Sequence, residues 1–294
     1  MDVSIIIVNY NTKDLLFQCL DSLYKNISGL EFEIIVVDNY SKENIDVIKA
    51  VFPKVQLIKS EINLGFGKAN NLGYKYANGE YVFLLNPDTI VLNNAVRILF
   101  DFMQAHKEIS ICGGQLFDAD MRKVHSFCLF LPSVLWEINI FACQYLHKIK
   151  EYFFLKRVAK LGYGEVSYIT GADMMIRASD IERYRLFDPD YFMYFEETDL
   201  SNRYRKNGKK SVFVPQSHIL HLEGKSFSFK EKRERMFFEG RKLYYQKNTS
   251  KLVHQCADFI YVLACMSRLL IYFLTLQRVK MREWYKRIAL FMSI

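Results

Sequence analysis

Residues 3–11 read Val3-Ser4-Ile5-Ile6-Ile7-Val8-Asn9-Tyr10-Asn11. The apolar run from Val3 to Val8 is almost entirely β-branched, which is typical of a central parallel strand that is covered on both faces. The run is too short for a signal peptide and has no basic flank, so no secretion signal is expected. We interpret it as the first buried strand of a domain that begins at the N-terminus.

Strands and helices alternate after this first strand. Apolar runs predict further strands at 33–37, 55–58, 81–85 and 109–112, and helical spacing predicts helices from residue 12, from Gly65 and over 93–106. This alternation indicates βαβ units, and therefore an α/β fold with a mostly parallel central sheet flanked by helices. Ligands bind at the carboxyl ends of the strands in such sheets, and Asp38 and Asp88 follow two of the predicted strands.

A second mixed region follows between residues 164 and 222. Its pattern predicts strands at 166–170 and 174–177, a helix at 198–206, and a strand at 211–214 that Pro215 is expected to end.

Composition indicates a globular protein with an unusual tail. Of the 294 residues, 51% are hydrophobic and 24% are charged, which excludes a disordered or fibrous chain. The net charge of +8 is uneven, because residues 230–294 hold 14 basic and 5 acidic side chains and residues 1–229 hold 26 and 27. We therefore expect no nucleic-acid partner, and a tail that meets an anionic surface. The six cysteines include no C-x-x-C pair, so neither a zinc site nor a disulfide framework is indicated and a reducing compartment is expected.

Two segments depart from the alternating pattern. Residues 127–160 are strongly apolar and then basic, which fits either an inserted, mobile amphipathic segment or a pair of core helices. Residues 254–276 are apolar except for one polar stripe at helical spacing, formed by His254, Asp258, Tyr261, Cys265, Arg268, Tyr272 and Thr275. Arg268 in the middle favours a helix that lies in a membrane interface, beside the basic residues that follow it; a helix packed on the domain or a partner, or a true membrane span, are the alternatives.

Four groups of side chains are candidates for chemistry. Asp38 suits hydrogen bonds from a base or ribose, although it also suits a helix N-cap. Asp88, beside Asn86, offers a partial shell for Mg²⁺ or Mn²⁺, although Asn-Pro-Asp is also ordinary turn chemistry.

The other two groups lie further along the chain. Glu196 and Glu197 follow an aromatic stretch, which suits a carboxylate of raised pKa acting as general base, although acidic residues also favour helix N-termini. His221 suits a metal or a diphosphate, but a lone histidine is more often structural.

A glycine-rich stretch at 63–73 could place backbone near a phosphate or ribose. In the dinucleotide-binding motif G-x-G-x-x-G, the third glycine would stand where this chain has Asn70. The stretch also follows the third strand instead of the first, so we do not interpret it as a dinucleotide-binding loop.

The order of these motifs matters more than any one of them. In sequence order they are residues 3–11, Val36-Val37-Asp38-Asn39, Asn63-x-Gly65-Phe66-Gly67-x-Ala69-Asn70-Asn71-x-Gly73, Asn86-Pro87-Asp88, Thr170-Gly171-Ala172, Phe192-Met193-Tyr194-Phe195-Glu196-Glu197-x-Asp199-Leu200 and His221-x-x-Gly224-x-Ser226. Over about residues 2–226 the chain thereby resembles a family 2 glycosyltransferase with the GT-A fold, most closely the rhamnosyltransferase-like branch. The segment 127–160 and the tail lie outside the resemblance.

The resemblance implies a role for each matching position. The donor nucleotide-sugar would be bound by Val8, Tyr10, Asp38, Asn63, Gly65, Asn70, Asn71 and Asn86. The sugar and acceptor cleft would be lined by Gly171, Ala172, Asp173 and Glu196. Asp88 and His221 would hold a divalent metal, Mg²⁺ or Mn²⁺, and Glu197 would be the catalytic base. Two positions depart from the family pattern, because Asn86 replaces the first Asp of D-x-D and Glu197 replaces an Asp.

These implications give a definite expectation. Residues 1–229 would form the GT-A domain, and residues 230–294 a basic, amphipathic, membrane-associated helical tail. The enzyme would move a sugar from a nucleotide-diphosphate sugar to a hydroxyl of a lipid-linked cell-surface glycan precursor, with inversion, on the cytoplasmic face of the cell membrane. The resemblance favours rhamnose as that sugar and leaves glucose, galactose, mannose and an N-acetylhexosamine open. The main alternative is a non-catalytic subunit that binds nucleotide-sugar or glycan. A nucleotidyltransferase is not favoured, because Asn9-Tyr10-Asn11 is not a glycine-rich triphosphate loop.

Overall fold

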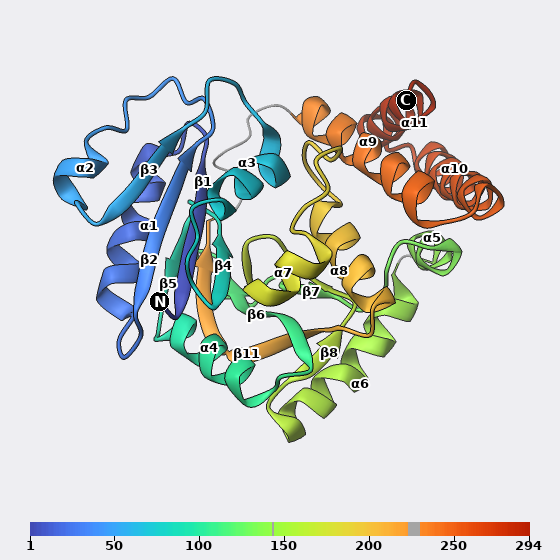
Figure 1. The fold of residues 1–294 in the computed structure, drawn as a ribbon. Coiled ribbons are helices and arrows are strands. Elements are labelled where there is room, and N and C mark those ends of the chain that lie inside the picture. The colour runs from blue at the N-terminus through green and yellow to red at the C-terminus, as the bar shows by residue number, and fades with distance from the viewer. Residues whose placement is uncertain (143, 223–229) are drawn as a thin grey trace.

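The computed structural model describes residues 1–142, 144–222 and 230–294, and Figure 1 shows their arrangement. Gly224 and Ser226 of the motif that starts at His221 lie outside the described residues.

A mixed β-sheet lies at the centre of the molecule. Its strands are β1 (Val3–Asn9), β2 (Phe32–Asp38), β3 (Val55–Lys59), β4 (Tyr81–Leu85), β5 (Thr89–Val91), β6 (Ile109–Phe117), β8 (Gly164–Val166), β10 (Asp173–Arg177) and β11 (Lys210–His221). Among the described residues the order is β3-β2-β1-β4-β10-β6-β11-β5, with β8 also paired to β11. Strands β1 to β4, β6 and β11 run in one direction and β5, β8 and β10 in the other. The expected mostly parallel α/β sheet is confirmed, with β10 as an antiparallel strand in its middle.

Helices cover both faces of this sheet. They are α1 (Lys13–Asn26), α2 (Ile48–Val51), α3 (Gly65–Tyr74), α4 (Ala95–Ala105), α7 (Ala178–Tyr184) and α8 (Glu196–Lys206). Ile5 and Ile7 of β1 belong to the core cluster that includes residues of α1 and α4, whereas Ile6 belongs to the cluster that includes residues of α3 and α8. Successive residues of a strand point to opposite faces, so the continuous apolar run of β1 is explained by a core on each side.

One expected strand boundary is wrong. Strand β11 does not end at Pro215 but continues to His221. Its pairing with β6 shifts register between Phe213 and His218, and this irregularity accommodates the proline, which has no N–H to donate to the ladder. The continuation matters because it carries His221 to the same region as Asp88.

The segment 127–160 contains the short strand β7 (Phe127–Cys128), which pairs with β9 (Tyr168–Ile169), and the helices α5 (Val134–Phe141) and α6 (Tyr145–Leu161). Helix α6 contacts the domain through Val158, its buried residue, and through Phe154, whose ring lies 4.9 Å from that of Phe127. Much of the remaining apolar surface of α6 is exposed, including Tyr145, Tyr152 and Phe153.

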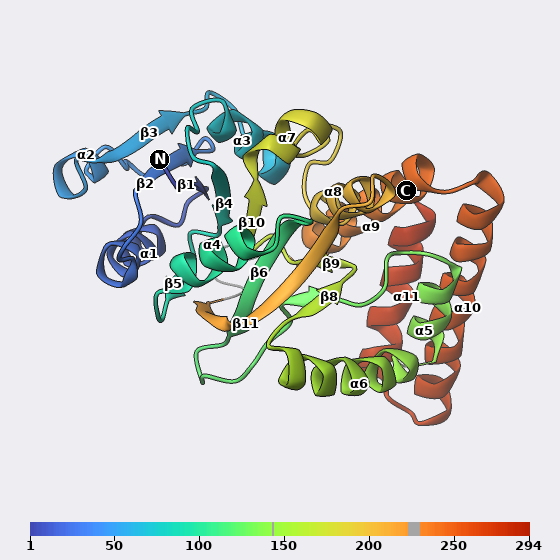
Figure 2. The same cartoon turned by 60° about the horizontal axis from the view of Figure 1, so that its bottom comes forward.

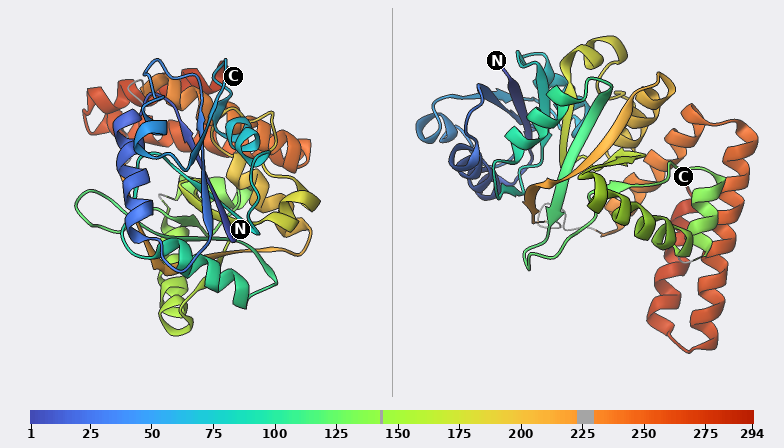
Figure 3. Two further views of the ribbon diagram at one scale, coloured as in Figure 1. Left: turned by 60° about the vertical axis from the view of Figure 1, so that its left-hand side comes forward. Right: turned by 90° about the horizontal axis from the view of Figure 1, so that it is seen from below.

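Three helices form the tail: α9 (Lys230–Asn248), α10 (Lys251–Leu274) and α11 (Arg278–Met292). Figure 2 shows α5 alongside α10, and Figure 3 shows α10 and α11 extending together beyond the sheet. Helix α10 is long and apolar enough to cross a bilayer by length and composition alone. We call α9, α10 and α11 the tail helices.

The polar stripe of α10 faces the protein. Asp258 pairs with Arg241 of α9 at 2.6 Å, Tyr261 and Cys265 are buried, and Arg268 donates hydrogen bonds to the carbonyls of Ile140 and Phe141, at 2.7 and 3.1 Å, where α5 ends. The apolar side of α10 is consequently turned outward.

Candidate active site

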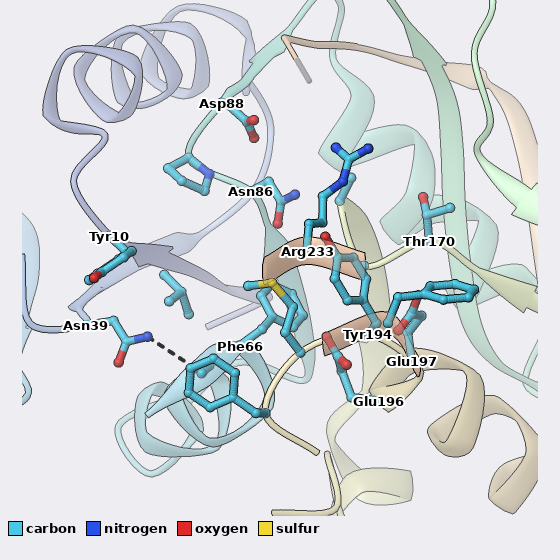
Figure 4. Close-up of a pocket in the computed structure, with 18 of the residues that line it drawn as sticks. Tyr10, Asn39, Phe66, Asn86, Asp88, Thr170, Tyr194, Glu196, Glu197 and Arg233 are labelled. Atoms are coloured by element: carbon cyan, nitrogen blue, oxygen red, sulfur yellow. Dashed lines mark hydrogen bonds between the residues drawn. The ribbon is translucent and has the colours of Figure 1, made fainter. Parts of the chain in front are cut away.

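A cavity of about 740 Å³ opens where the carboxyl ends of β1 and β4 meet the start of α8. Its volume lies within the range of roughly 300–1,000 Å³ that is usual for small-molecule sites. Figure 4 shows that residues from distant parts of the sequence, from Tyr10 to Arg233, surround it. The position agrees with the rule that ligands bind at the carboxyl ends of parallel strands.

One side of the cavity is organised by Asn39, which follows β2. Its amide donates to the Asn63 side chain at 3.1 Å and to the Gly65 carbonyl at 3.2 Å, and its oxygen accepts from the Leu64 N–H at 2.8 Å. Gly65 has a φ of +77°, and a Cβ there would lie 2.1 Å from the Phe192 carbonyl oxygen. Only glycine fits this combination of left-handed backbone and close approach.

Asp88 and His221 meet on another side. Asp88 lies in the turn after β4, and His221 ends β11. The backbone hydrogen bond from Leu222 N–H to Asp88 C=O, 2.9 Å long, holds the two segments together. The Asp88 Oδ1 and His221 Nε2 atoms are 3.3 Å apart, and the Asn86 amide nitrogen lies 3.4 Å from the same ring nitrogen.

These side chains fit a divalent cation. A carboxylate oxygen and an imidazole nitrogen at this separation can share one Mn²⁺ or Mg²⁺ ion. The described residues contain no cluster of three or more His, Cys, Asp or Glu side chains for a metal. The rest of the shell would therefore come from substrate oxygens and water, as is usual for Mg²⁺ with phosphate substrates.

The two glutamates stand at the start of α8. The preceding Tyr194 and Phe195 both have positive φ values, +70° and +68°, which are uncommon for such residues. Such backbone conformations cost energy and persist only where the surrounding structure holds them, and they are found most often at functional sites. Here that backbone directs both glutamates to the cavity wall.

The carboxyl groups of both glutamates have raised pKa values. Glu196 is buried and its Oε2 has no hydrogen-bond partner among the described residues. Burial raises the pKa of Glu196, and repulsion by Glu197 raises it further. Burial also raises the pKa of Glu197, to about 7. A carboxylate with a pKa near neutrality is suited to accept a proton from a substrate hydroxyl.

The structure brings most of the predicted site residues together. The cavity is lined by Val8, Tyr10, Asn63, Gly65, Asn86, Asp88, Gly171, Ala172, Glu196, Glu197 and His221.

Four other predicted residues are not among those that line the cavity. Asp38 accepts a hydrogen bond from Asn9, Asn70 donates to the Phe66 carbonyl, and Asn71 bonds both the N–H and the carbonyl of Phe187. Asp173 is fully buried and accepts from the Gly114 N–H at 2.6 Å. These contacts lie within the protein, and the assignment of all four residues to donor or acceptor binding stays a prediction.

The cavity wall also includes residues that sequence reasoning did not assign to it. They are Thr12, Asn39, Phe66, Pro87, Thr170, Phe192, Met193, Tyr194, Lys232, Arg233, Glu234, Phe237 and Arg287. Asn39 could have been found, because it follows Asp38 directly. The residues from Lys232 onward carry no local signal, since only the packing of the tail helices brings them to the site.

Comparison with known proteins identifies the kind of site. A family model described as glycosyl transferase family 2 matches residues 4–185. The rhamnosyltransferase WbbL of Escherichia coli K12 is 26% identical over 228 residues, which cover 74% of this chain and 83% of WbbL. An N-acetylglucosaminyl-diphospho-decaprenol L-rhamnosyltransferase of Mycobacterium tuberculosis is 26% identical over 60% of this chain and 61% of its own length.

Solved structures show the fold. GalNAc-T7, determined with UDP, GalNAc and Mn²⁺, superposes with a TM-score of 0.61 at 18% identity, over 84% of this chain and 48% of its own. TarS of S. aureus, residues 1–349 with UDP-GlcNAc, superposes with a TM-score of 0.56 at 15% identity, over 100% of this chain and 91% of its own. The expected GT-A type of α/β fold is confirmed by this likeness.

Proposed function

The chain belongs to glycosyltransferase family 2, and from that premise we propose that it is an inverting hexosyltransferase that acts on a lipid-linked glycan precursor. Membership of the family makes it an enzyme that transfers sugar from an activated donor. Two of the relatives described above are named as rhamnosyltransferases, and the name of one gives a sugar diphosphate of decaprenol as its acceptor. We propose rhamnose as the transferred sugar on that basis.

One observation carries the proposal. A single cavity holds the Asp88–His221 pair, whose nearest side-chain atoms are 3.3 Å apart, and Glu197, whose pKa burial raises to about 7. Donor activation and base catalysis therefore share one space that is large enough for a nucleotide-sugar. The absent first acidic residue of D-x-D, at Asn86, leaves Asp88 and His221 to hold the metal.

The chain's own residues suffice to outline a single displacement. Tyr10, Asn39 and the turn at Gly65 would hold the nucleoside. Glu197 would take the proton of the acceptor hydroxyl while that oxygen forms a bond to the anomeric carbon and the bond from this carbon to the diphosphate breaks. Attack from the side opposite the leaving group inverts the configuration. A divalent cation bound by Asp88 and His221 would supply positive charge that offsets the negative charge of the departing nucleoside diphosphate.

The lipid-linked acceptor is proposed from the outer surface of the tail helices. Phe259, Phe273 and Leu274 of α10 are 64%, 64% and 70% exposed, and apolar side chains of α5, α6 and α11 are exposed as well. Large apolar patches on a protein surface mark membrane or partner contacts. With its polar stripe against the protein and its apolar side outward, α10 is oriented for burial in a bilayer interface.

We therefore propose that the enzyme lies peripherally on the cytoplasmic face of the cell membrane. Basic residues of α11, such as Lys280, Arg282 and Lys286, would meet anionic headgroups. The mycobacterial relative, by its name, acts on an acceptor that is a sugar diphosphate of decaprenol. An acceptor of this type would present its sugar to the cavity while its lipid stays in the bilayer.

The test is a transfer assay with full-length protein. We would incubate it with dTDP-rhamnose, and with UDP- and GDP-sugars, together with Mn²⁺ or Mg²⁺ and a short-chain N-acetylglucosaminyl diphosphate lipid, and follow product by mass spectrometry. We expect transfer from one of these donors, and we expect a chelator to abolish it. The variant Asp88→Asn should lower both the rate of transfer and the affinity for Mn²⁺. Transfer that survives complete metal removal would contradict the assigned metal role.

Glu197→Gln separates this proposal from a non-catalytic, glycan-binding role. We expect the variant to lose transfer by about 10²–10⁴-fold while it binds the donor nearly as tightly as the wild type. Glu196→Gln, a neighbouring isosteric change, should cause a smaller loss. Binding of donor by the wild type without transfer to any acceptor would favour the non-catalytic alternative.

A further inference from the structure

The tail helices bring three cations to the wall of the cavity. Lys232 and Arg233 come from α9 and Arg287 from α11, and Figure 4 shows Arg233 reaching into the same space as Asn86 and Asp88. Glu234 is the acidic residue that these helices add to the wall within the described residues. The tail helices therefore contribute an excess of positive charge to the cavity, in addition to the basic residues on their own outer surface.

Some cations of the tail are held by acidic partners, and these three are not held in this way within the described residues. Elsewhere in the tail, Arg241 pairs with Glu137 and Asp258, and Lys247 pairs with Asp188 and Asp190, all at 2.6 Å. Within the part of the chain that the structure describes, Lys232, Arg233 and Arg287 make no ion pair. The Nε of Arg287 is buried without a hydrogen-bond acceptor, although the guanidinium packs over the rings of Phe238 and Trp284. A buried donor without a partner is costly, which points to an anion that it meets in use.

We propose that Lys232, Arg233 and Arg287 form a subsite for the diphosphate of the acceptor. This inference rests on the proposed function. The chemistry matches, because guanidinium groups bind phosphate oxygens with paired, charge-assisted hydrogen bonds and an ammonium adds a compact charge.

The origin of these cations in the tail helices is our reason for assigning them to the acceptor's diphosphate, although they share one cavity with Asp88 and His221. Asp88 and His221 provide a metal site for the donor diphosphate at the ends of β4 and β11. The three cations instead come from α9 and α11, the helices that lie against the outward-facing α10. A lipid-linked acceptor carries its diphosphate between the glycan, which must reach Glu197, and the lipid, which must stay with the apolar surface. A cationic subsite between these two regions is where that diphosphate would lie.

Calorimetry on full-length protein tests the assignment with three probes. Farnesyl diphosphate stands for the acceptor diphosphate, farnesol for the lipid alone, and UDP or dTDP with Mn²⁺ for the donor. The variants are Arg233→Gln and Arg287→Gln. Matched controls on the same two helices are Arg235→Gln and Arg278→Gln, which are exposed and outside the cavity wall. Arg233 is itself exposed, so its replacement leaves the packing of α9 intact.

We expect each cavity variant to weaken farnesyl diphosphate binding about tenfold or more, with farnesol, nucleotide and control affinities within about threefold of wild type. Unchanged farnesyl diphosphate binding, an equal loss in the controls, or a loss confined to UDP and dTDP would each overturn the inference. A wild-type protein that binds no nucleoside diphosphate would instead contradict the proposed function, so the two failures are distinguishable.

Discussion

Glu197 should set the pH dependence of sugar transfer. Burial raises the pKa of its carboxyl to about 7, and a general base must be ionised to accept a proton. Protons therefore compete with the substrate hydroxyl as the pH falls below 7. We expect kcat/KM to fall about tenfold for each pH unit below 7 and to level off above it, in an initial-rate series from pH 5.5 to 8.5 with saturating metal.

Donor affinity measured over the same series is the control, because Glu197 is not assigned to nucleotide binding. A rate that stays constant down to pH 5.5 would mean either that the carboxyl of Glu197 has an ordinary pKa or that another residue or water takes the proton.

Single residues also mark how far the sequence could predict the site. Asp88, Glu197 and His221 follow apolar or aromatic runs, so a strand or turn that presents a charged side chain is visible locally, and all three line the cavity. The local pattern does not predict which of the adjacent residues Asp38 and Asn39 lines the cavity. Adjacent residues after a strand point in different directions, and only the three-dimensional turn makes Asn39 line the cavity while Asp38 bonds Asn9.

The entry to helix α3 depends on the backbone of Gly65. A Cβ at this position would meet the Phe192 carbonyl, and φ is +77°. Gly208 has a nearly equal φ of +76°, but a Cβ there would meet no atom within 4 Å. We expect Gly208→Ala to lower the free energy of unfolding by about 1 kcal/mol and Gly65→Ala by about 3 kcal/mol or more, measured by urea denaturation. Equal losses would show that the close approach to Phe192 is not rigid.

A buried ion cluster joins α5, α9 and α10. Arg241 and Glu137 are 1% and 0% exposed, their closest atoms are 2.6 Å apart, and Arg241 also reaches Asp258. Replacing Arg241 with Met leaves the Glu137 carboxylate buried and unpaired, so we expect the free energy of unfolding at pH 7 to fall by about 3–5 kcal/mol. The double variant Arg241→Met/Glu137→Met should recover much of this loss, as judged by denaturation of all three proteins.

The sign of the pH effect provides a further check on this cluster. Burial raises the pKa of Glu137 even beside Arg241, and removal of the cation raises it more. The protonated carboxyl is then favoured in the folded state, and this contribution to stability is present at low pH and lost as the pH rises. The deficit of Arg241→Met should therefore shrink between pH 7 and pH 5, and a deficit that grows over this interval would contradict the assignment.

Elements with strong periodicity were predictable, and those that depend on partners were not. The run of β1 and the amphipathic pattern of α4 are properties of their own residues. By contrast, Pro215 is a local signal for a strand end, and its pairing with β6 across an irregular register overrides that signal. The polar stripe of α10 was visible in sequence, but its direction was not, because hydrogen bonds from Arg268 to the end of α5 decide which side faces the protein.

At the scale of the whole molecule, α10 presents a row of exposed apolar side chains, and we expect this surface to bind membranes. Leu270 and Phe273 of α10 are 59% and 64% exposed. Leu270→Glu/Phe273→Glu should lower partitioning onto phosphatidylglycerol-containing vesicles about tenfold or more in a co-sedimentation assay, because two apolar side chains no longer enter the interface.

The matched control is Val47→Glu/Val51→Glu, at exposed apolar positions in and beside α2, which Figure 1 shows on the opposite side of the molecule from α10. Its vesicle binding should equal that of the wild type. Equal pelleting of all three proteins would show that the exposed side of α10 does not contact the membrane.

The cavity wall extends in sequence from Val8 to Arg287, and this span has a consequence for biosynthesis. The ribosome adds residue 287 roughly 3–12 s after residue 229, at about 5–20 residues per second. During that interval the sheet can fold while its site still lacks the wall supplied by α9 and α11. A nascent chain would thus be able to fold around donor nucleotide before it could engage a lipid-linked acceptor, so translation itself delays the onset of transfer until the helices that reach the membrane have been made.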